Sequence, residues 1–281
     1  MKKQKLITKA SGEKVPFSSK QLIRSLKRSG AKEQIVNNVI KQIESNLYNG
    51  ITTQEIFRSA FAHLRKLSKH SASRYKLKQS IMEFGPTGFP FEVFVGELLK
   101  EQGFSTTVGS IFKGHCVNHE VDVIAEKEDK LFMVECKFHN HTGIKCDVKI
   151  PLYIQSRFKD IERMWKDHPQ NSVKFHQGWV VTNTHFSDDA IQYGICAGLN
   201  LLGWDYPKNE GIKDLIDSLN LYPVTCLTSL TKIEKQQLIE KNILLCRDLL
   251  QNKKVLNTIG MSLNRINGIL NDCETIFNKK S

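Results

Sequence analysis

Two adjacent runs of alternating residues in the middle of the chain constrain its fold more than any other feature. They cover residues 119–127 and 130–138, and the polar pair Glu128-Asp129 separates them. A two-residue polar turn between such runs indicates an antiparallel hairpin. A helical pattern, a strand pattern over 177–183, and another helix and strand follow. Strand, helix and strand at this spacing predict a parallel crossover, so we expect a mixed sheet flanked by helices.

Breaker residues and a change of pattern divide the 281-residue chain. The run Gly85-Pro86-Thr87-Gly88-Phe89-Pro90 ends a mostly helical segment, and Trp204-Asp205-Tyr206-Pro207 precedes a segment that is helical throughout. A chain of this length accommodates two or three domains. We predict a multidomain α/β protein with a helical domain over 1–85, a mixed β-sheet core flanked by helices over 86–215, and an all-α module over 216–281.

Three local patterns give more detailed expectations. Residues 105–108 are expected to form a short strand, followed by a glycine-containing loop. The apolar residues over 238–250 predict one helix. On the strand over 130–138, the alternation places Phe132, Val134, Cys136 and Phe138 on one face, which we expect to be the core face.

The net charge of +12 is unevenly distributed. Residues 1–85 hold 18 Lys and Arg against 5 Asp and Glu, whereas residues 86–215 hold 14 against 18. Residues 216–281 hold 9 basic residues and 6 acidic ones. Two basic ends around an acidic middle favour a polyanionic partner such as nucleic acid. A solvated basic surface without such a partner is the alternative.

Two observations bear on the compartment. No apolar run approaches the length of a membrane-spanning helix, and no apolar signal core follows the basic start of the chain. The seven cysteines are scattered and form no CxxC pair, which indicates reduced thiols. We therefore expect a cytoplasmic protein with no membrane partner.

Charged residues on the two central strands form a candidate catalytic site. Glu135 and Lys137 share one strand face, and Asp122 converges on them from the preceding strand. Two carboxylates with backbone carbonyls nearby suit Mg²⁺ or Mn²⁺, so we expect a metal site at Asp122, Glu135 and Cys136. Lys137 would stabilise charge on a phosphate, and Glu92 would add a ligand or a base. The alternative is a surface Asp with a Glu–Lys pair on an edge strand.

A zinc site is a second alternative for this region, which is rich in histidine and cysteine. The spacing of these residues matches no common structural zinc pattern. The candidates would be His115, Cys116, His119, Cys136, His139, His141 and Cys146.

Taken in order, these motifs resemble the PD-(D/E)xK nuclease superfamily, and most closely its Mrr-like restriction endonucleases. The resemblance covers about residues 89–206 and includes Phe91-Glu92, Asp122, Glu135-Cys136-Lys137 and the run from Gln177 to Ala190, which contains Thr182-Asn183. It implies metal-dependent hydrolysis of DNA phosphodiester bonds by Asp122, Glu135 and Lys137, in a restriction or defence enzyme. Val121 stands where the superfamily has proline. Cleavage of both strands would favour a homodimer, by analogy.

The N-terminal segment resembles an ATP-cone, a nucleotide-binding regulatory domain. The matching residues are Ile7-Thr8-Lys9, Gly12, Pro16-Phe17, the Leu22-to-Leu26 helix and Gly50-Ile51-Thr52-Thr53. The resemblance implies binding of ATP or dATP near Lys9, Gly12 and Lys20. Ala10 and Gln21 stand where the family usually has basic residues. A cone that has lost its nucleotide and now contacts DNA or a second copy stays open as the alternative.

The C-terminal segment resembles helix-hairpin-helix modules, on the run Leu256-Asn257-Thr258-Ile259-Gly260-Met261-Ser262, and a second hairpin with Asn in place of Gly would lie at Asn242-Ile243. Such a hairpin presents backbone N–H groups to a DNA phosphate. The resemblance implies double-stranded DNA as the partner. A plain helical bundle is the alternative. The expected DNA-contacting residues are Ile259, Gly260, Met261, Lys253, Lys254 and Arg265.

The function predicted from these patterns is metal-dependent endonucleolytic cleavage of DNA, modulated by a nucleotide if the cone binds one. Two alternatives stay open: a non-catalytic, nucleotide-responsive DNA-binding regulator, and a nuclease with the same core that cleaves RNA or structured DNA.

Overall fold

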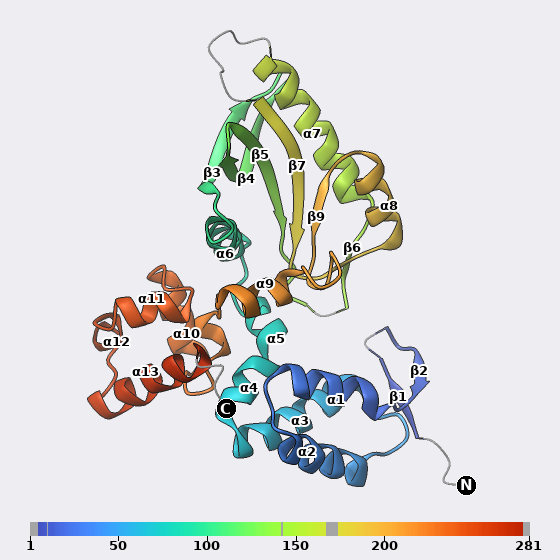
Figure 1. The fold of residues 1–281 in the computed structure, drawn as a ribbon, viewed down its shortest axis with the longest axis vertical. Coiled ribbons are helices and arrows are strands. Elements are labelled where there is room, and N and C mark those ends of the chain that lie inside the picture. The colour runs from blue at the N-terminus through green and yellow to red at the C-terminus, as the bar shows by residue number, and fades with distance from the viewer. Residues whose placement is uncertain (1–4, 10, 142, 167–173, 278–281) are drawn as a thin grey trace. The chain divides into compact units, whose positions relative to one another are not determined.

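The computed structural model describes residues 5–9, 11–141, 143–166 and 174–277, so Ala10 lies outside the described residues. The chain divides into two compact units (Figure 1). One is formed by Ile81–Leu221, and the other combines the N-terminal Met1–Ser80 with the C-terminal Tyr222–Ser281. None of the described helices is both long enough and apolar enough to cross a membrane.

The central unit contains the expected mixed sheet. Its strand order is β3-β4-β5-β7-β9, in which β3, β4 and β5 are antiparallel neighbours and β5, β7 and β9 are parallel. The backbone at Glu128 and Asp129 has φ values of +51° and +57°, as a two-residue hairpin turn between β4 and β5 requires. The strands are β3 (Ser105–Lys113), β4 (Asn118–Lys127), β5 (Lys130–Lys137), β7 (Lys174–Thr182) and β9 (Asn200–Leu202).

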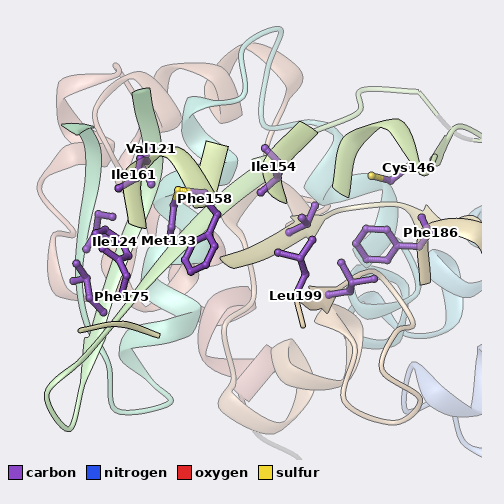
Figure 2. Packing of buried hydrophobic residues seen from close by; sticks show 14 residues of the cluster. Val121, Ile124, Met133, Cys146, Ile154, Phe158, Ile161, Phe175, Phe186 and Leu199 are labelled. Atoms are coloured by element: carbon purple, nitrogen blue, oxygen red, sulfur yellow. The ribbon is translucent and has the colours of Figure 1, made fainter. Parts of the chain in front are cut away.

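Helices cover both faces of this sheet (Figure 1). On one side Phe91 of α6 (Phe89–Lys100) lies 5.6 Å from the Phe138 ring, measured between ring centroids. On the other side α7 (Lys149–Lys166) contributes Ile154, Phe158 and Ile161 to a buried cluster that contains Leu131 and Met133, and Figure 2 shows part of this packing. The expected core face of β5 is confirmed, because Phe132, Val134 and Cys136 are buried. The opposite face is buried as well, at Leu131 and Met133, as is common where parallel strands are covered by helices on both sides.

Smaller elements complete the central unit. Ser187 caps α8 by accepting the N–H of Ala190. The other elements are β6 (Lys145–Cys146), β8 (His185–Phe186), α8 (Asp188–Cys196) and α9 (Ile212–Leu219).

Two expected boundaries are wrong. The strand that begins at Ser105 continues to Lys113 along the whole of its partner β4, and Gly109 lies inside it at φ +69° rather than in a loop. The helix expected over 238–250 is two helices, α10 (Lys232–Glu240) and α11 (Cys246–Gln251). Asn242, at φ +59°, separates them, because asparagine tolerates this left-handed conformation.

The N-terminal part of the other unit begins with a two-stranded hairpin and continues as helices. Thr52 and Glu55 form a capping box at the start of α3. The elements are β1 (Leu6–Thr8), β2 (Lys14–Pro16), α1 (Ser19–Arg28), α2 (Glu33–Asn46), α3 (Thr53–Leu67), α4 (Lys69–Tyr75) and α5 (Leu77–Met82).

The C-terminal part of this unit is helical and packs on the N-terminal part. The Thr225 hydroxyl, fully buried, donates to the Ser80 carbonyl at 2.7 Å, and the Arg74 guanidinium lies 5.3 Å from the centroid of the Tyr222 ring. Besides α10 and α11, this part contains the 3₁₀ turn Val224–Cys226, α12 (Val255–Thr258) and α13 (Leu263–Phe277).

Candidate active site

Asp122 and Glu135 lie next to each other where the β4–β5 pairing ends. The last paired residues on this side are Val123 and Val134, and Asp122 and Glu135 are the next residues on the two strands. The Asp122 carboxylate accepts the backbone N–H of Cys136 at 2.6 Å, a charge-assisted bond that ties the two strands together. The hairpin register therefore brings together the two carboxylates that the sequence singles out.

Glu135 also has a cationic partner that the sequence analysis missed. Nη1 of Arg157, on α7, lies 2.6 Å from Glu135 Oε2, and Nη2 donates to the backbone carbonyl of Glu120 on β4. The exposed fractions of the two side chains are 11% for Arg157 and 19% for Glu135. One guanidinium thus joins α7 to both β4 and β5.

The Asp122 and Glu135 carboxyl groups bind their protons more tightly than usual. Burial, followed by the neighbouring Asp122 carboxylate, raises the pKa of Glu135 to about 7, although Arg157 and Lys137 oppose the shift. Burial likewise raises the pKa of Asp122, against the Cys136 N–H bond, Arg157 and Lys137. Lys137 thus favours the charged form of both carboxyl groups.

Glu92 joins this acidic cluster from α6. Burial raises its pKa to about 7, and the carboxylates of Asp122 and Glu120 add to the shift. Like charges at short range disfavour ionisation of one another. A carboxyl group that titrates near neutral pH is suited to accept and release a proton under ordinary conditions.

The donor set of this cluster fits a hard divalent cation in its chemistry. Crowded carboxyls with raised pKa values would be relieved by a cation, and carboxylate oxygens are its preferred ligands. Asp122 and Glu135 would hold it. Burial raises the pKa of the Cys136 thiol well above its usual range, so any ligand from Cys136 would be its backbone carbonyl. Within the described residues, no three His, Cys, Asp or Glu side chains are already arranged as a metal site.

The N-terminal hairpin and the helices behind it enclose a pocket of about 310 Å³. Lys9 and Gln21 line it, and Lys9 also forms an ion pair with Glu13 at 2.8 Å. Gly12 lies in the hairpin turn at φ +84°, and exposed Lys20 does not line the pocket. The remaining lining residues are mainly apolar: Ile7, Val15, Pro16, Phe17, Ser18, Leu22, Thr53 and Ile56.

The two C-terminal turns have the same backbone hydrogen bonds. Gly260, at φ +78°, donates to Asn257 and is followed by a bond from Met261 to Leu256. Asn242 and Ile243 repeat this pattern with acceptors at Ile239 and Leu238. The second hairpin expected from the sequence is therefore present as a turn of equal geometry.

Of the other residues expected to contact DNA, Lys253 and Lys254 are exposed at the start of α12. Met261 is buried and Ile259 is partly buried, so their side chains pack within the module. Arg265 forms a two-pronged ion pair with Glu234, with distances of 2.6 and 2.9 Å.

Three family models match the chain: an ATP cone domain at residues 5–79, a restriction endonuclease domain of the Mrr catalytic type at residues 86–203, and an AF1548-like C-terminal domain at residues 222–277. An uncharacterised protein of Archaeoglobus fulgidus is 35% identical over 190 residues, which are 65% of this chain and 99% of the relative. The crystal structure of AF1548, a protein of unknown function, is 33% identical with a TM-score of 0.57 and covers 69% of this chain and 100% of its own. The chain belongs to the AF1548-like family. A crystal structure of VC1899 from Vibrio cholerae aligns with 14% identity and a TM-score of 0.31, over 72% of this chain and 56% of that one.

The matches confirm the resemblances to an ATP-cone and to the Mrr-type nucleases. The central domain of this AF1548-like protein is a nuclease domain of the restriction endonuclease type. The division at residues 85 and 215 stays a prediction, because the packing joins the two ends of the chain into one unit.

Hydrogen bonds to the end of β5 account for the Thr182-Asn183 pair in the restriction endonuclease domain. The fully buried Thr182 hydroxyl donates to the Lys137 carbonyl at 2.8 Å. The Asn183 side chain accepts the His139 N–H at 2.9 Å and donates to the His139 carbonyl at 2.7 Å. These bonds hold the end of β5, so they fix the backbone that carries Glu135 and Lys137.

Among the residues weighed as a zinc site, His119 has a carboxylate partner. His119 lies 2.8 Å from the Asp160 carboxylate, which also accepts the backbone N–H groups of Cys116 and Val117. Asp160 therefore fastens the β3–β4 loop to α7. Cys136 and Cys146 are buried thiols, and burial raises the pKa of Cys146 to about 12.

Proposed function

We propose that this AF1548-like protein is an endonuclease that hydrolyses DNA phosphodiester bonds with Mg²⁺ or Mn²⁺. The observation that carries the proposal is the meeting of Asp122 and Glu135 at the end of the β4–β5 pairing, with Lys137 acting on both. The match to a restriction endonuclease model supports the same chemistry.

Each side chain of the site has its own role in the proposed reaction. Asp122 and Glu135 would hold the cation, which would supply a water molecule of lowered pKa and would offset charge on the phosphate. Lys137 stabilises the charge that develops on the phosphoryl oxygens. Glu92, with a pKa of about 7, exchanges a proton with water or with the leaving group.

Double-stranded DNA is the proposed substrate, and host defence by restriction is the proposed role. The net charge of the chain, +12, supports a polyanionic partner. The C-terminal turns with exposed Lys253 and Lys254 beside them supply contacts to phosphate. Two copies would be needed to cut both strands in one binding event, so we propose a homodimer on DNA.

The first test compares alanine variants of the three central residues. Asp122→Ala, Glu135→Ala and Lys137→Ala should each lower plasmid cleavage by at least about a hundredfold, since each removes a group that acts on the reacting phosphate. DNA affinity in gel-shift experiments should change little. Lys130→Ala, an exposed lysine on the same strand as Lys137, is the matched control and should cleave normally.

The assay is run with Mg²⁺ or Mn²⁺, with methylated and unmethylated plasmid, and with single-stranded RNA. Cleavage of RNA alone would replace the DNA proposal by the RNA alternative. Wild-type rates in any of the three alanine variants would contradict the proposed active site.

A nucleotide-modulated activity is a second proposal, and it rests on the pocket that Lys9 and Gln21 line in the ATP cone. ATP or dATP would place its base against the apolar lining and its phosphates toward Lys9. Gln21 would offer an amide where the family usually has a basic residue, which predicts weak binding.

A further inference from the structure

Arg157 occupies a place at the site that the proposed chemistry does not explain. Its Nη1 lies 2.6 Å from Glu135 Oε2, while Nη2 donates to the Glu120 carbonyl. The guanidinium carbon also lies 5.4 Å from the centroid of the Tyr153 ring, one helical turn earlier on α7. Three contacts thus hold a largely buried cation against one of the proposed metal ligands.

A divalent cation and this guanidinium make opposing demands on Glu135. A cation held by Asp122 and Glu135 would bring a second positive charge to the carboxylate that Arg157 already pairs with. Two positive charges a few ångströms apart repel each other strongly in a partly buried site, where little water screens them. Glu135 Oε2 would also have to share its lone pairs between Arg157 and the cation.

Resting on the proposed function, we propose that Arg157 is the resident counter-ion of Glu135 and gives up this carboxylate when the divalent cation binds. Arg157 is then a positioning residue: it holds the Glu135 side chain in place before the cation arrives, and its pairing competes with cation binding. Its contacts with the Glu120 carbonyl and Tyr153 do not involve Glu135, so they keep the guanidinium at the site after the exchange.

A different role for Arg157 would be purely structural. The side chain connects α7 to β4 and β5, and a helix-to-sheet link of this kind would contribute to stability alone. The two roles differ in the sign of one measurable effect. A competing counter-ion lowers the affinity for the cation, so its removal must raise that affinity. A structural link preserves the site, so its removal must lower the affinity or leave it unchanged.

The test measures Mn²⁺ binding to the full chain without DNA, by counting free Mn²⁺ in electron paramagnetic resonance spectra. Arg157→Gln should bind Mn²⁺ at least about fivefold more tightly than the wild type. Arg157→Lys keeps the charge but cannot reach Glu135 and the Glu120 carbonyl together, so it should gain less. Measured against Glu135→Gln alone, the double variant Arg157→Gln/Glu135→Gln should show no such gain, because the two residues act as a pair.

Thermal unfolding of each variant accompanies the binding measurement. Unchanged or weaker Mn²⁺ binding in folded Arg157→Gln would overturn the proposal, and if Arg157→Gln does not fold, the result for Arg157→Lys decides. Absence of Mn²⁺ binding in the wild type and in every variant would overturn it as well. Plasmid cleavage by the wild type tests the proposed nuclease function separately, so the two failures are distinguishable.

Discussion

Single carboxyl groups show how the site departs from ordinary protein surfaces. Glu92 and Glu135 both have a pKa raised to about 7, with burial as the main cause and neighbouring carboxylates as the next. A buried acid of this kind binds its proton more tightly in the folded protein than in the unfolded chain. Such groups cost stability once the pH is high enough to ionise them, and sites that tolerate this cost are often functional.

The sign of this effect gives a prediction for Glu92. Its folded pKa of about 7 lies above the ordinary value of 4.5, so the folded protein binds more protons between these two values, and stability falls as the pH rises from about 4.5 to 7. Glu92→Gln carries no charge at either end of this window. The variant should therefore be more stable than the wild type at pH 8, by about 1 kcal/mol once solvent screening of this partly exposed side chain is allowed for, and should lose this advantage below about pH 4.5.

Urea denaturation at pH 4.5 and pH 8, without divalent cations, measures the difference. Glu126→Gln, at an exposed position on β4, is the control and should change stability little at either pH. A Glu92→Gln variant that gains nothing at pH 8 would show that the Glu92 carboxyl is not held in the acidic cluster.

At the scale of elements, the sequence best predicts those turns and helix ends whose conformation is determined by neighbouring residues. The turn at Glu128-Asp129, the Thr52 capping box and the Ser187 cap were all predictable, because a few neighbouring residues determine each of them. The full length of β3 was not predictable, since its second half depends on pairing with β4.

The candidate site divides in the same way. Asp122, Glu135 and Lys137 were found because strand alternation and one hairpin register bring them together. Arg157 was not found, because it lies 22 residues beyond Glu135, on a helix that reaches the site only through tertiary packing. Nothing in the local pattern around Arg157 distinguishes it from other basic residues on α7.

The glycines of the C-terminal helices allow a test of the turn before α13. Gly260 has φ +78° and open space around its Cα, so Gly260→Ala adds backbone strain without a clash and should destabilise the protein by about 1 kcal/mol. Gly268, within α13, also has open space but no positive φ, so Gly268→Ala should stabilise by about 0.5–1 kcal/mol. Chemical denaturation of both variants provides the measurement. Equal effects of the two substitutions would mean that the turn does not require a left-handed residue.

At the scale of the molecule, the order of the segments along the chain differs from the way in which they pack into units. Pattern changes along the sequence predict three successive domains, whereas the first and last parts pack into one unit through contacts such as Thr225 with Ser80 and Arg74 with Tyr222. Composition cannot reveal such a contact, because the residues involved are ordinary buried hydroxyl, aromatic and basic side chains. A ligand of the ATP cone therefore binds a unit that also contains the C-terminal turns.

This packing affects the stabilisation that we predict for nucleotide binding. ATP or dATP that binds the native protein at 100 times its dissociation constant should stabilise it by about 2.7 kcal/mol. Because the C-terminal part belongs to the same unit as the cone, the thermal transition that rises should include the helices on both sides of Gly260. With Gln21 in place of a basic residue, this shift is expected only at millimolar nucleotide. Lys9→Ala should remove this shift, because among the described residues Lys9 is the basic one that lines the pocket.

Differential scanning fluorimetry of the full chain, with Lys41→Ala on α2 as a charge-matched control, measures this shift. Hydrogen exchange of the amides around Gly260, with and without nucleotide, shows whether the stabilisation reaches the C-terminal turns. A shift confined to the cone would mean that the two parts unfold separately despite their contacts. No shift with millimolar ATP or dATP would mean that the cone has kept its fold without its ligand. Its basic surface, 18 Lys and Arg against 5 Asp and Glu over residues 1–85, would then be explained by contact with DNA alone.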